Sequence, residues 1–521
     1  MAESLSWPLE VETGAGTVRG ADDLENTVAW RGIPFGASPV GDLRWRAARD
    51  PEPWTGVRQC TEFGPAPWMP GAPDSSEDSL YLNVWRPDDA EVGLPVYVWV
   101  AGGANQLQVP RLSDTPGRTV ASRSKVVFVS VSYRVGEMGW FCHPALRDGD
   151  PLDGSGNYGT LDIIKGLEWV RDNIAAFGGD PGNVTLTGES AGAYNTLTLL
   201  ISPAARGLFH RVMSQSGRTE TVSVEEGDEA GEAILGRLLS EEHAGDAAGA
   251  AARAGMGTDE VAAYLRSRTA EQLAVAARGL FRAGFSDGAV IGANGFASLD
   301  DGTYPNKVPA IIGMNQEETK FFLARRNREL QGDRALWEEV TSVASAQKRA
   351  TGCDLVLRRL ASNADQPPVY GYLFRWGWGG EHASPLREPT SWMLGACHGM
   401  DIAFFLHGGE APLFGRNTFN EENEPGRTSL SLAMMGYLAN FAHTGDPGTA
   451  GAGLPAWEPW SNDAGAPKLI VFDADLSERL VRMDSEELTV GAVRVLFDAL
   501  PEESQKLAAS AERTFALAAP A

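Results

Sequence analysis

Strand-like runs alternate with helical patterns along the first part of the chain, and this alternation limits the possible folds more than any other feature. The runs at 95–100 and 125–133 are almost wholly apolar and rich in valine and aromatic residues, which is typical of strands buried on both faces of a parallel sheet. Helical spacing follows at 160–177 and ends at two glycines. A further apolar run at 184–188 leads into the helix-compatible segment 191–201. The alternation predicts βαβ units and therefore an α/β protein with a mostly parallel sheet.

The composition indicates one elaborated domain. The chain has 521 residues, of which 43% are hydrophobic and 22% charged, which is ample material for a large core. Residues 223–283 are rich in Ala, Glu and Arg with helical periodicity, strand character returns at 308–315, and 320–362 is helical again. Neither a Ser/Gly linker nor an internal repeat divides the chain. We expect a single domain over 1–521 with a mainly helical insertion around 223–283.

The charge balance is strongly acidic. Lys and Arg number 44 and Asp and Glu 69, which gives a formal net charge of −25. Such a surface repels nucleic acid and anionic membranes, so neither is expected as a partner. It would attract a cationic substrate only weakly, and solvated surface charge is the simpler interpretation.

The start of the chain and the cysteines bear on location. The opening segment MAESLSWPLEVETG lacks the basic and apolar regions of a signal peptide, and no apolar run approaches the ~18 residues that span a bilayer. The cysteines show neither a CxxC pair nor metal-ligand spacing; they are Cys60, Cys142, Cys353 and Cys397. Because they are sparse for a disulfide scaffold, we expect a reducing, cytoplasmic environment and no bound metal.

A serine lies between a predicted strand and a predicted helix, in the pattern Gly188-Glu-Ser190-Ala-Gly192. A GxSxG serine on such a turn projects its hydroxyl out of the sheet, and small flanking residues relieve the crowding. The backbone N–H of the next residue, Ala191, then points toward an oxyanion at the helix N-terminus. The pattern and its context together predict Ser190 as a nucleophile.

Three other motifs lack the context that their chemistry needs. A second GxSxG at 284–288 follows a helical stretch and precedes a glycine-rich one, so Ser286 is interpreted as a turn residue. The SxxK match at 122–125 leads into a strand instead of opening a helix. The GxGxxG match at 154–159 has no strand before it, which argues against a dinucleotide site.

An activated serine needs a base and an orienting carboxylate, which on this type of fold follow it in the order acid, then histidine. Four histidines lie far enough downstream: His382, His398, His407 and His443. The acid should follow a strand, and both Glu317 and Glu318 follow the run at 308–315. The residues alone leave all four histidines and both glutamates open.

Seven segments spread along nearly the whole chain carry a family likeness: RGIPFGASPVGDLRW, EDSLYLNVW, NIAAFGGDPGNVTLTGESAGA, SQSG, VPAIIGMNQEE, GACHGMD and FAHTGDP. Together they resemble the type-B carboxylesterases, the family that includes cholinesterases and bacterial p-nitrobenzyl esterases. The resemblance implies an α/β-hydrolase fold, with a large, mostly parallel central sheet flanked by helices and with helical insertions. It also implies a serine esterase.

The resemblance selects among the open candidates. The family pattern G-x-N-x-x-E falls on residues 313–318 and implies Glu318 as the triad acid. The family segment A-x-H-G falls on 396–399 and implies His398 as the base. His407-Gly-Gly resembles an oxyanion HGG, but it follows the nucleophile, where that loop cannot be.

The oxyanion loop of the family reads Gly-Gly-Gly after an apolar strand, and here the strand leads into Ala101-Gly-Gly-Ala104-Asn105. The resemblance implies the backbone N–H groups of Gly103, Ala104 and Ala191 as donors. Alanine keeps its N–H, so Ala104 preserves the hole but departs from members that accept bulky tertiary-alcohol esters. Asn105 is either a polar group of the acyl pocket or a turn residue.

Aromatic residues are further candidates for the substrate pocket. Trp68 lies in a loop that is short compared with the choline-binding loop of cholinesterases, so specific choline-ester hydrolysis is not expected. Trp376 is a second candidate, and core packing is the alternative for both. Ser79 replaces a disulfide cysteine of secreted relatives, in agreement with a cytoplasmic enzyme.

The resemblance therefore implies a small-molecule ester as the substrate, an acyl-enzyme on Ser190 that water hydrolyses, and neither cofactor nor metal. We expect a monomer or small homo-oligomer. Two alternatives stay open. The same triad serves amide, carbamate and polyester-oligomer hydrolysis, and some members of the family are non-catalytic binding proteins.

Overall fold

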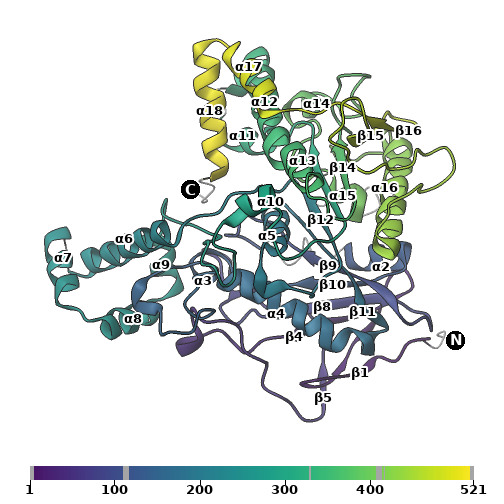
Figure 1. Cartoon of the computed structure of the whole chain (residues 1–521). Coiled ribbons are helices and arrows are strands. Elements are labelled where there is room, and N and C mark those ends of the chain that lie inside the picture. The colour runs from purple at the N-terminus through teal and green to yellow at the C-terminus, as the bar shows by residue number, and fades with distance from the viewer. Residues whose placement is uncertain are drawn as a thin grey trace.

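The protein was analysed as a computed structural model that describes residues 5–108, 116–243, 245–327, 330–406, 414–415 and 417–516. Among these residues, eleven strands form one central sheet (Figure 1). In spatial order they are β16 (Arg479–Asp484), β15 (Leu469–Ala474), β14 (Val369–Phe374), β13 (Ala310–Asn315), β12 (Arg211–Gln215), β11 (Gly179–Glu189), β9 (Leu94–Val100), β10 (Val127–Val131), β8 (Tyr81–Pro87), β4 (Thr27–Pro34) and β3 (Ala21–Asp23).

The centre of the sheet is parallel and its two margins are antiparallel. All neighbouring strands from β15 to β10 pair in parallel, whereas β16 pairs antiparallel with β15, and β8, β4 and β3 continue antiparallel beyond β10. The predicted α/β fold with a mostly parallel sheet is confirmed. Smaller sheets lie apart: β1 (Glu10–Thr13), β2 (Gly16–Arg19) and β5 (Val57–Gln59), and the pair β6 (Ala66–Pro67) and β7 (Ser75–Ser76).

Apolar residues on both faces of the central strands explain their continuous hydrophobic runs. In β9, Val96 and Val98 pack in one core cluster, while Tyr97 and Trp99 pack in a second cluster on the other face. The first cluster includes residues of α4 (Tyr158–Asn173), and the second includes residues of α2 (Pro116–Ser124) and α16 (Glu424–Thr444). Burial of both faces requires apolar residues at successive positions, because side chains alternate along a strand.

The predicted helix at 160–177 is α4 followed by a 3₁₀ turn at Ile174–Phe177, and Gly178 ends it in the left-handed conformation with φ of 80°. Residues 223–283 contain α6 (Val224–Glu242), α7 (Asp246–Gly255), α8 (Thr258–Ser267) and α9 (Ala270–Ala276). Figure 1 shows these four helices extending to one side of the sheet, with α7 farthest out. Their packing partners include α3 (Gly136–Gly139) and the turn Pro144–Leu146.

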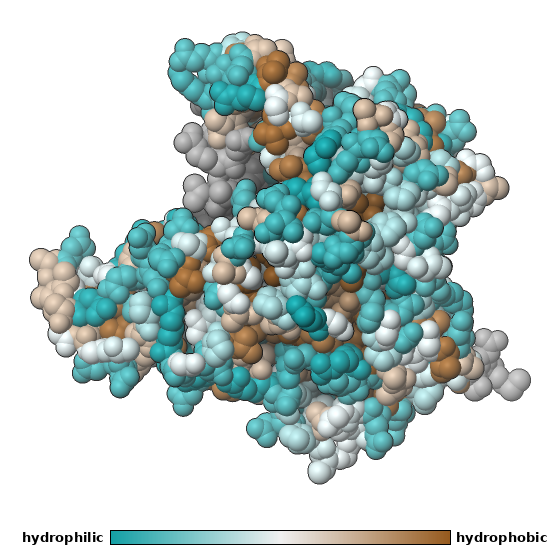
Figure 2. Space-filling model, in the orientation of Figure 1, coloured by the Kyte–Doolittle hydropathy of each residue, from teal (hydrophilic) through white to brown (hydrophobic). Residues whose placement is uncertain are grey.

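The C-terminal part adds helices at the other end of the sheet. Figure 1 shows these helices together: α11 (Lys320–Arg326), α12 (Arg334–Arg349), α13 (Leu355–Ala361), α14 (Thr390–Met393), α17 (Val490–Asp498) and α18 (Glu502–Ala516). Trp392 of the short α14 packs in the same hydrophobic cluster as α12 and α18. Two further short helices are α10 (Ser298–Asp301) and α15 (Ile402–Leu406). Figure 2 shows hydrophilic residues over most of the visible face. Within the described ranges, no helix is long and apolar enough to cross a membrane.

Candidate active site

Ser190 lies at the turn between β11 and α5 (Ala191–Leu200), at the carboxyl end of the sheet's central strand. Its backbone has φ of 56° and ψ of −118°, a conformation that L-residues rarely adopt. The Ser190 N–H donates to Gln215 O at 2.9 Å, and Tyr194 N–H donates to Ser190 O at 2.9 Å. These bonds tie the strained turn to β12 and to the first turn of α5.

The two glycines of the motif are required by close backbone contacts. A Cβ at Gly188 would lie 2.4 Å from the Gly192 carbonyl carbon, and a Cβ at Gly192 would lie 2.0 Å from Val100 O. Both distances are far below van der Waals contact. The strand, the serine and the helix can therefore approach one another only because residues 188 and 192 carry no side chain.

Glu318 follows β13 in the turn that precedes α11 and is completely buried. Its Oε1 accepts hydrogen bonds from the Asn315 N–H at 2.9 Å and from the Ser216 hydroxyl, and its Oε2 lies 2.5 Å from His398 Nδ1. Ser216 comes directly after β12, so the ends of two neighbouring strands hold one carboxylate. The carboxylate in turn orients the imidazole, because Nδ1–H donates to it and Nε2 is left for the cavity.

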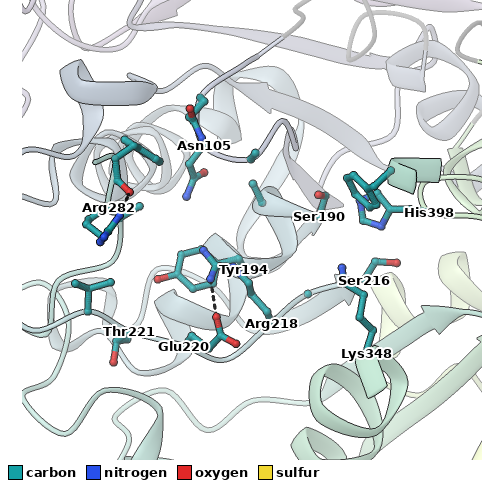
Figure 3. A pocket seen from close by; sticks show the side chains of 18 residues that line it. Asn105, Ser190, Tyr194, Ser216, Arg218, Glu220, Thr221, Arg282, Lys348 and His398 are labelled. Atoms are coloured by element: carbon teal, nitrogen blue, oxygen red, sulfur yellow. Dashed lines mark hydrogen bonds and ion pairs between the residues drawn. The ribbon is translucent and has the colours of Figure 1, made fainter. Parts of the chain in front are cut away.

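His398 lies between two carboxylates. On the side away from Glu318, its Nε2 is 3.0 Å from Glu189 Oε1, although the geometry at that oxygen is not that of a hydrogen bond. The Phe322 ring packs against the imidazole with a centroid distance of 4.7 Å. Figure 3 shows the Ser190 hydroxyl directed toward the His398 ring at one end of a cavity.

Burial and charge act in opposite directions on these three groups. Burial lowers the pKa of His398, but the negative charges of Glu189 and Glu318 outweigh it and leave the pKa above its ordinary value. Burial raises the pKa of Glu318, but the charge of His398 and its hydrogen bond reverse the shift and lower that pKa. Burial raises the pKa of Glu189 to about 7, against the opposing charge of His398. The arrangement stabilises a protonated imidazole beside an ionised Glu318.

The loop that is expected to form the oxyanion hole, residues 102–105, follows β9 and contacts the turn at Ser190. A Cβ at Gly102 would lie 2.7 Å from Glu189 O, and one at Gly103 would lie 1.9 Å from Leu107 O. Gly103 has φ of 124°, and Ala104 and Asn105 both have φ of 57°. Three successive residues with positive φ store backbone strain, which persists only where the surroundings hold the loop.

An amide pair holds this loop against α5. The Asn105 side chain is buried; its Nδ2 donates to Asn195 Oδ1 at 3.2 Å, and Asn195 Nδ2 donates to Asn105 Oδ1 at 2.9 Å. The Asn105 carbonyl accepts from Gly136 N–H at 2.7 Å. Asn105 therefore contributes to the cavity lining and also occupies a left-handed turn position.

The cavity beside Ser190 has a volume of about 340 Å³. Of the residues proposed from the sequence, Ser190, His398, Ala104, Ala191 and Asn105 line it, while Glu318 lies behind His398. Figure 3 shows that the remaining walls carry Tyr194, Ser216, Arg218, Glu220, Thr221, Arg282 and Lys348.

The structure brings neither tryptophan candidate to this cavity. Trp376 is fully buried and packs on Phe404 and Phe419, with ring centroids 4.9 Å and 5.5 Å away. Trp68 is partly buried against the core cluster that contains Val96. For both residues the alternative stated from the sequence, core packing, describes what is observed.

The other acid–base candidates have different partners. Glu317 Oε1 is 2.5 Å from Lys320 Nζ, and its Oε2 accepts from Ala396 N–H. His382 pairs with Asp473, and His443 contacts Ser124 O. His407 lies outside the described residues. The second GxSxG serine, Ser286, does not line the cavity.

Several site residues were not found from the sequence. Ser216 had a signal, because it lies in SQSG directly after the strand that neighbours β11, and Glu189 lies inside the GxSxG motif itself. No sequence signal identified Arg218, Arg282 and Lys348, because isolated cationic residues in loops and on helices are usually interpreted as surface charge. Within the described residues, no cluster of three or more His, Cys, Asp or Glu side chains could hold a metal ion.

Comparisons with known proteins agree on family and fold. Residues 8–353 and 350–479 match the sequence profile of the carboxylesterase family. A para-nitrobenzyl esterase of Bacillus subtilis is 38% identical over 235 residues, or 43% of this chain and 47% of that protein, so the chain spans about half the length of that relative. A medium-chain fatty acyl-CoA hydrolase precursor of Anas platyrhynchos is 30% identical over 524 residues, 87% of each chain.

A solved structure matches over almost the whole chain. It is a carboxylesterase of Geobacillus stearothermophilus, which superimposes with a TM-score of 0.72 at 29% identity and covers 94% of this chain and 99% of that one. The α/β-hydrolase fold expected from the motifs is confirmed.

Proposed function

Since the chain belongs to the carboxylesterase family, we propose that it hydrolyses small-molecule carboxylic esters with Ser190 as nucleophile, His398 as general base and Glu318 as the orienting carboxylate. The family membership confirms the resemblance of its motifs. The observation that carries the assignment of residues is the 2.5 Å contact between His398 Nδ1 and Glu318 Oε2, on an imidazole that shares a cavity with Ser190.

The first step is attack by the serine hydroxyl. His398 Nε2 takes the Ser190 proton while Oγ attacks the ester carbonyl, and Glu318 stabilises the imidazolium that forms. The raised pKa of His398 favours this protonation. The positive φ of Ser190 keeps its hydroxyl out of the sheet, where the carbonyl can reach it.

The second element is stabilisation of the tetrahedral oxyanion. We assign this role to the backbone N–H groups of Gly103, Ala104 and Ala191. Ala104 and Ala191 line the cavity next to Ser190; Gly103 directly precedes Ala104 in the strained loop, and Ala191 is the first residue of α5. Donors held in place before the reaction require no reorganisation as the charge develops. The alcohol then leaves with a proton from His398, and water, activated by the same imidazole, releases the acid.

The test is the hydrolysis of 4-nitrophenyl esters from acetate to decanoate by wild type, Ser190→Ala and Ser286→Ala. Loss of the nucleophile should lower kcat by a factor on the order of 10⁶. Ser286 occupies the second GxSxG but not the cavity, so its alanine variant is a matched control that should retain activity.

An organophosphate probe gives an independent readout. It should label the wild type once per chain, at Ser190, and should leave Ser190→Ala unlabelled. Wild-type turnover in Ser190→Ala would refute the assignment. An unreactive wild type would favour the non-catalytic alternative instead.

A further inference from the structure

The wall of the cavity carries positive charge in an otherwise acidic protein. Three cationic side chains and one carboxylate line it: Arg218, Arg282, Lys348 and Glu220. The whole chain has a formal net charge of −25. Three cationic side chains around one cavity therefore contrast with the net negative charge of the whole protein. The contacts of each cation show which of them remain available to a substrate.

Lys348 is engaged with the catalytic end. Burial lowers its pKa, and its charge interacts with the carboxylates Glu318 and Glu189 on the two sides of His398. Its Nζ also lies 5.4 Å from the centre of the Phe322 ring, which packs on the imidazole. We therefore assign Lys348 the role of compensating the negative charge of these two buried carboxylates.

Arg218 is held in position but only partly used. One of its terminal nitrogens, Nη1, is 2.8 Å from Glu220 Oε2, and the guanidinium lies over the Tyr194 ring, 4.7 Å from the ring centre. Tyr194 belongs to α5 and is fully buried, so the stacking fixes the arginine against a rigid element. A guanidinium has five N–H donors, and the contact with Glu220 leaves donors available.

Arg282 is the cation least compensated by carboxylates. Its Nη1 donates to the Phe281 carbonyl at 2.9 Å, and it forms no ion pair with any residue in the part of the chain that the structure describes. Glu226 feels the charge of Arg282, but its lowered pKa arises first from hydrogen bonds with the Ser223 backbone and hydroxyl in a capping box. Figure 3 shows Arg282 at the end of the cavity away from His398.

We propose that the cavity takes esters that carry a carboxylate away from the scissile carbonyl, with Arg282 binding that carboxylate and Arg218 flanking it. Guanidinium groups bind carboxylates through charge-assisted, paired hydrogen bonds, which a neutral ester cannot form. The net charge of −25 repels an anion at long range, so the selectivity must come from contact inside the cavity. This substrate class rests on the proposed esterase function.

The experiment compares mono-4-nitrophenyl adipate with 4-nitrophenyl hexanoate, which replaces the free carboxylate by a methyl group. The readout is the ratio of the two kcat/KM values in each enzyme, so that a general loss of activity cancels. Wild type should favour the adipate about tenfold, as one charge-assisted hydrogen bond typically provides. Glutarate and suberate monoesters then locate the carboxylate along the cavity.

The variants assign the preference to residues. Arg282→Gln should bring the ratio close to one, Arg218→Gln should lower it less because Glu220 already engages that arginine, and Arg282→Lys should give an intermediate ratio. Arg278→Gln is the matched control: Arg278 is exposed, four residues before Arg282, and does not line the cavity. Its ratio should equal that of wild type.

The outcomes distinguish a failure of the proposed substrate class from a failure of the proposed esterase function. Hydrolysis of hexanoate with no preference for adipate, or a preference that survives in both Arg282→Gln and Arg218→Gln, would overturn the substrate class and leave the esterase assignment standing. Hydrolysis of neither ester would overturn both.

Discussion

On one side of Ser190 the proposed oxyanion loop, residues 102–105, is held by neutral groups, and on the other side His398 is held by charged ones. The Asn105–Asn195 amide pair and the hydrogen bond from Gly136 N–H to the Asn105 carbonyl fix the loop, in which residues 103–105 all have positive φ. Glu318 and Glu189, 2.5 Å and 3.0 Å from the two ring nitrogens, fix the histidine. Only the second arrangement titrates near neutral pH, so substitutions and pH should separate the two sides.

Among substitutions on the two sides of Ser190, the largest effect is expected where charge is removed from the histidine side. Glu318→Gln keeps the shape of the side chain but removes the acceptor that orients Nδ1–H and stabilises the imidazolium, so kcat should fall by about 10⁴. The measurement is steady-state hydrolysis of a 4-nitrophenyl ester. Glu317→Gln removes the adjacent carboxylate, which contacts Lys320 instead of His398, and should lose far less. Equal losses in the two variants would contradict the choice of Glu318.

A smaller effect is expected from steric displacement of the oxyanion loop. Gly103→Ala places a Cβ 1.9 Å from Leu107 O in a residue with φ of 124°, which displaces the loop and its N–H donors. Loss of an oxyanion donor costs about 10² to 10³ in kcat. Gly93→Ala is the control, since Gly93 also has positive φ, at 73°, but its Cβ would meet nothing within 4 Å. Similar rates in the two variants would show that the loop does not bind the oxyanion.

Loss of the amide pair should be milder. Asn195→Ala leaves the buried Asn105 amide without its partner, which costs about 1 to 3 kcal/mol, and kcat should fall about tenfold with little change in KM. Because no charge is removed, the pH dependence of kcat/KM should keep its midpoint. A moved midpoint would show that the two sides of Ser190 are not independent.

The smallest effect, and the sharpest contrast with Asn195→Ala, is a shift in pH dependence. A general base works when neutral, so kcat/KM rises with pH through the pKa of His398, which lies above the ordinary value of about 6.5. The negative charge of Glu189 helps to raise the pKa of His398, so Glu189→Gln should move the midpoint of kcat/KM to lower pH. A midpoint that stays in place would remove Glu189 from the electrostatics of the site.

Short-range patterns in the sequence were sufficient for the strands and for Ser190. The runs at 95–100 and 184–188 indicated β9 and β11 because strands buried on both faces need apolar residues at every position. Ser190 stood out because the strand, the turn glycines and the helix that define its chemistry are contiguous. The helix at 160–177 was predicted from its spacing; the structure differs in its start at Tyr158 and in the 3₁₀ tightening of its last turn.

The partners of Ser190 depended on contacts between distant segments. Four histidines and two glutamates were equivalent until family resemblance chose His398 and Glu318, because those two residues lie 80 positions apart and meet through the pairing of β13 with β14. For the tryptophans, the sequence suggested pocket positions that the structure does not place at the cavity. Tryptophan is a residue type that often lines pockets, and only the packing of Phe404 and Phe419 against Trp376 shows that it lies in the core.

The sequence by itself determined the α/β class, the order of the central elements and the strand–turn–helix that carries Ser190, because each depends on residues that are neighbours in the chain. The tertiary structure alone decided which side chains surround the substrate cavity. Arg218 follows β12, Arg282 follows α9, and Lys348 lies near the end of α12, and no local pattern relates these three positions. Their common charge acquires meaning only when the fold places them around Ser190, because electrostatic interaction depends on distance in space and not along the chain.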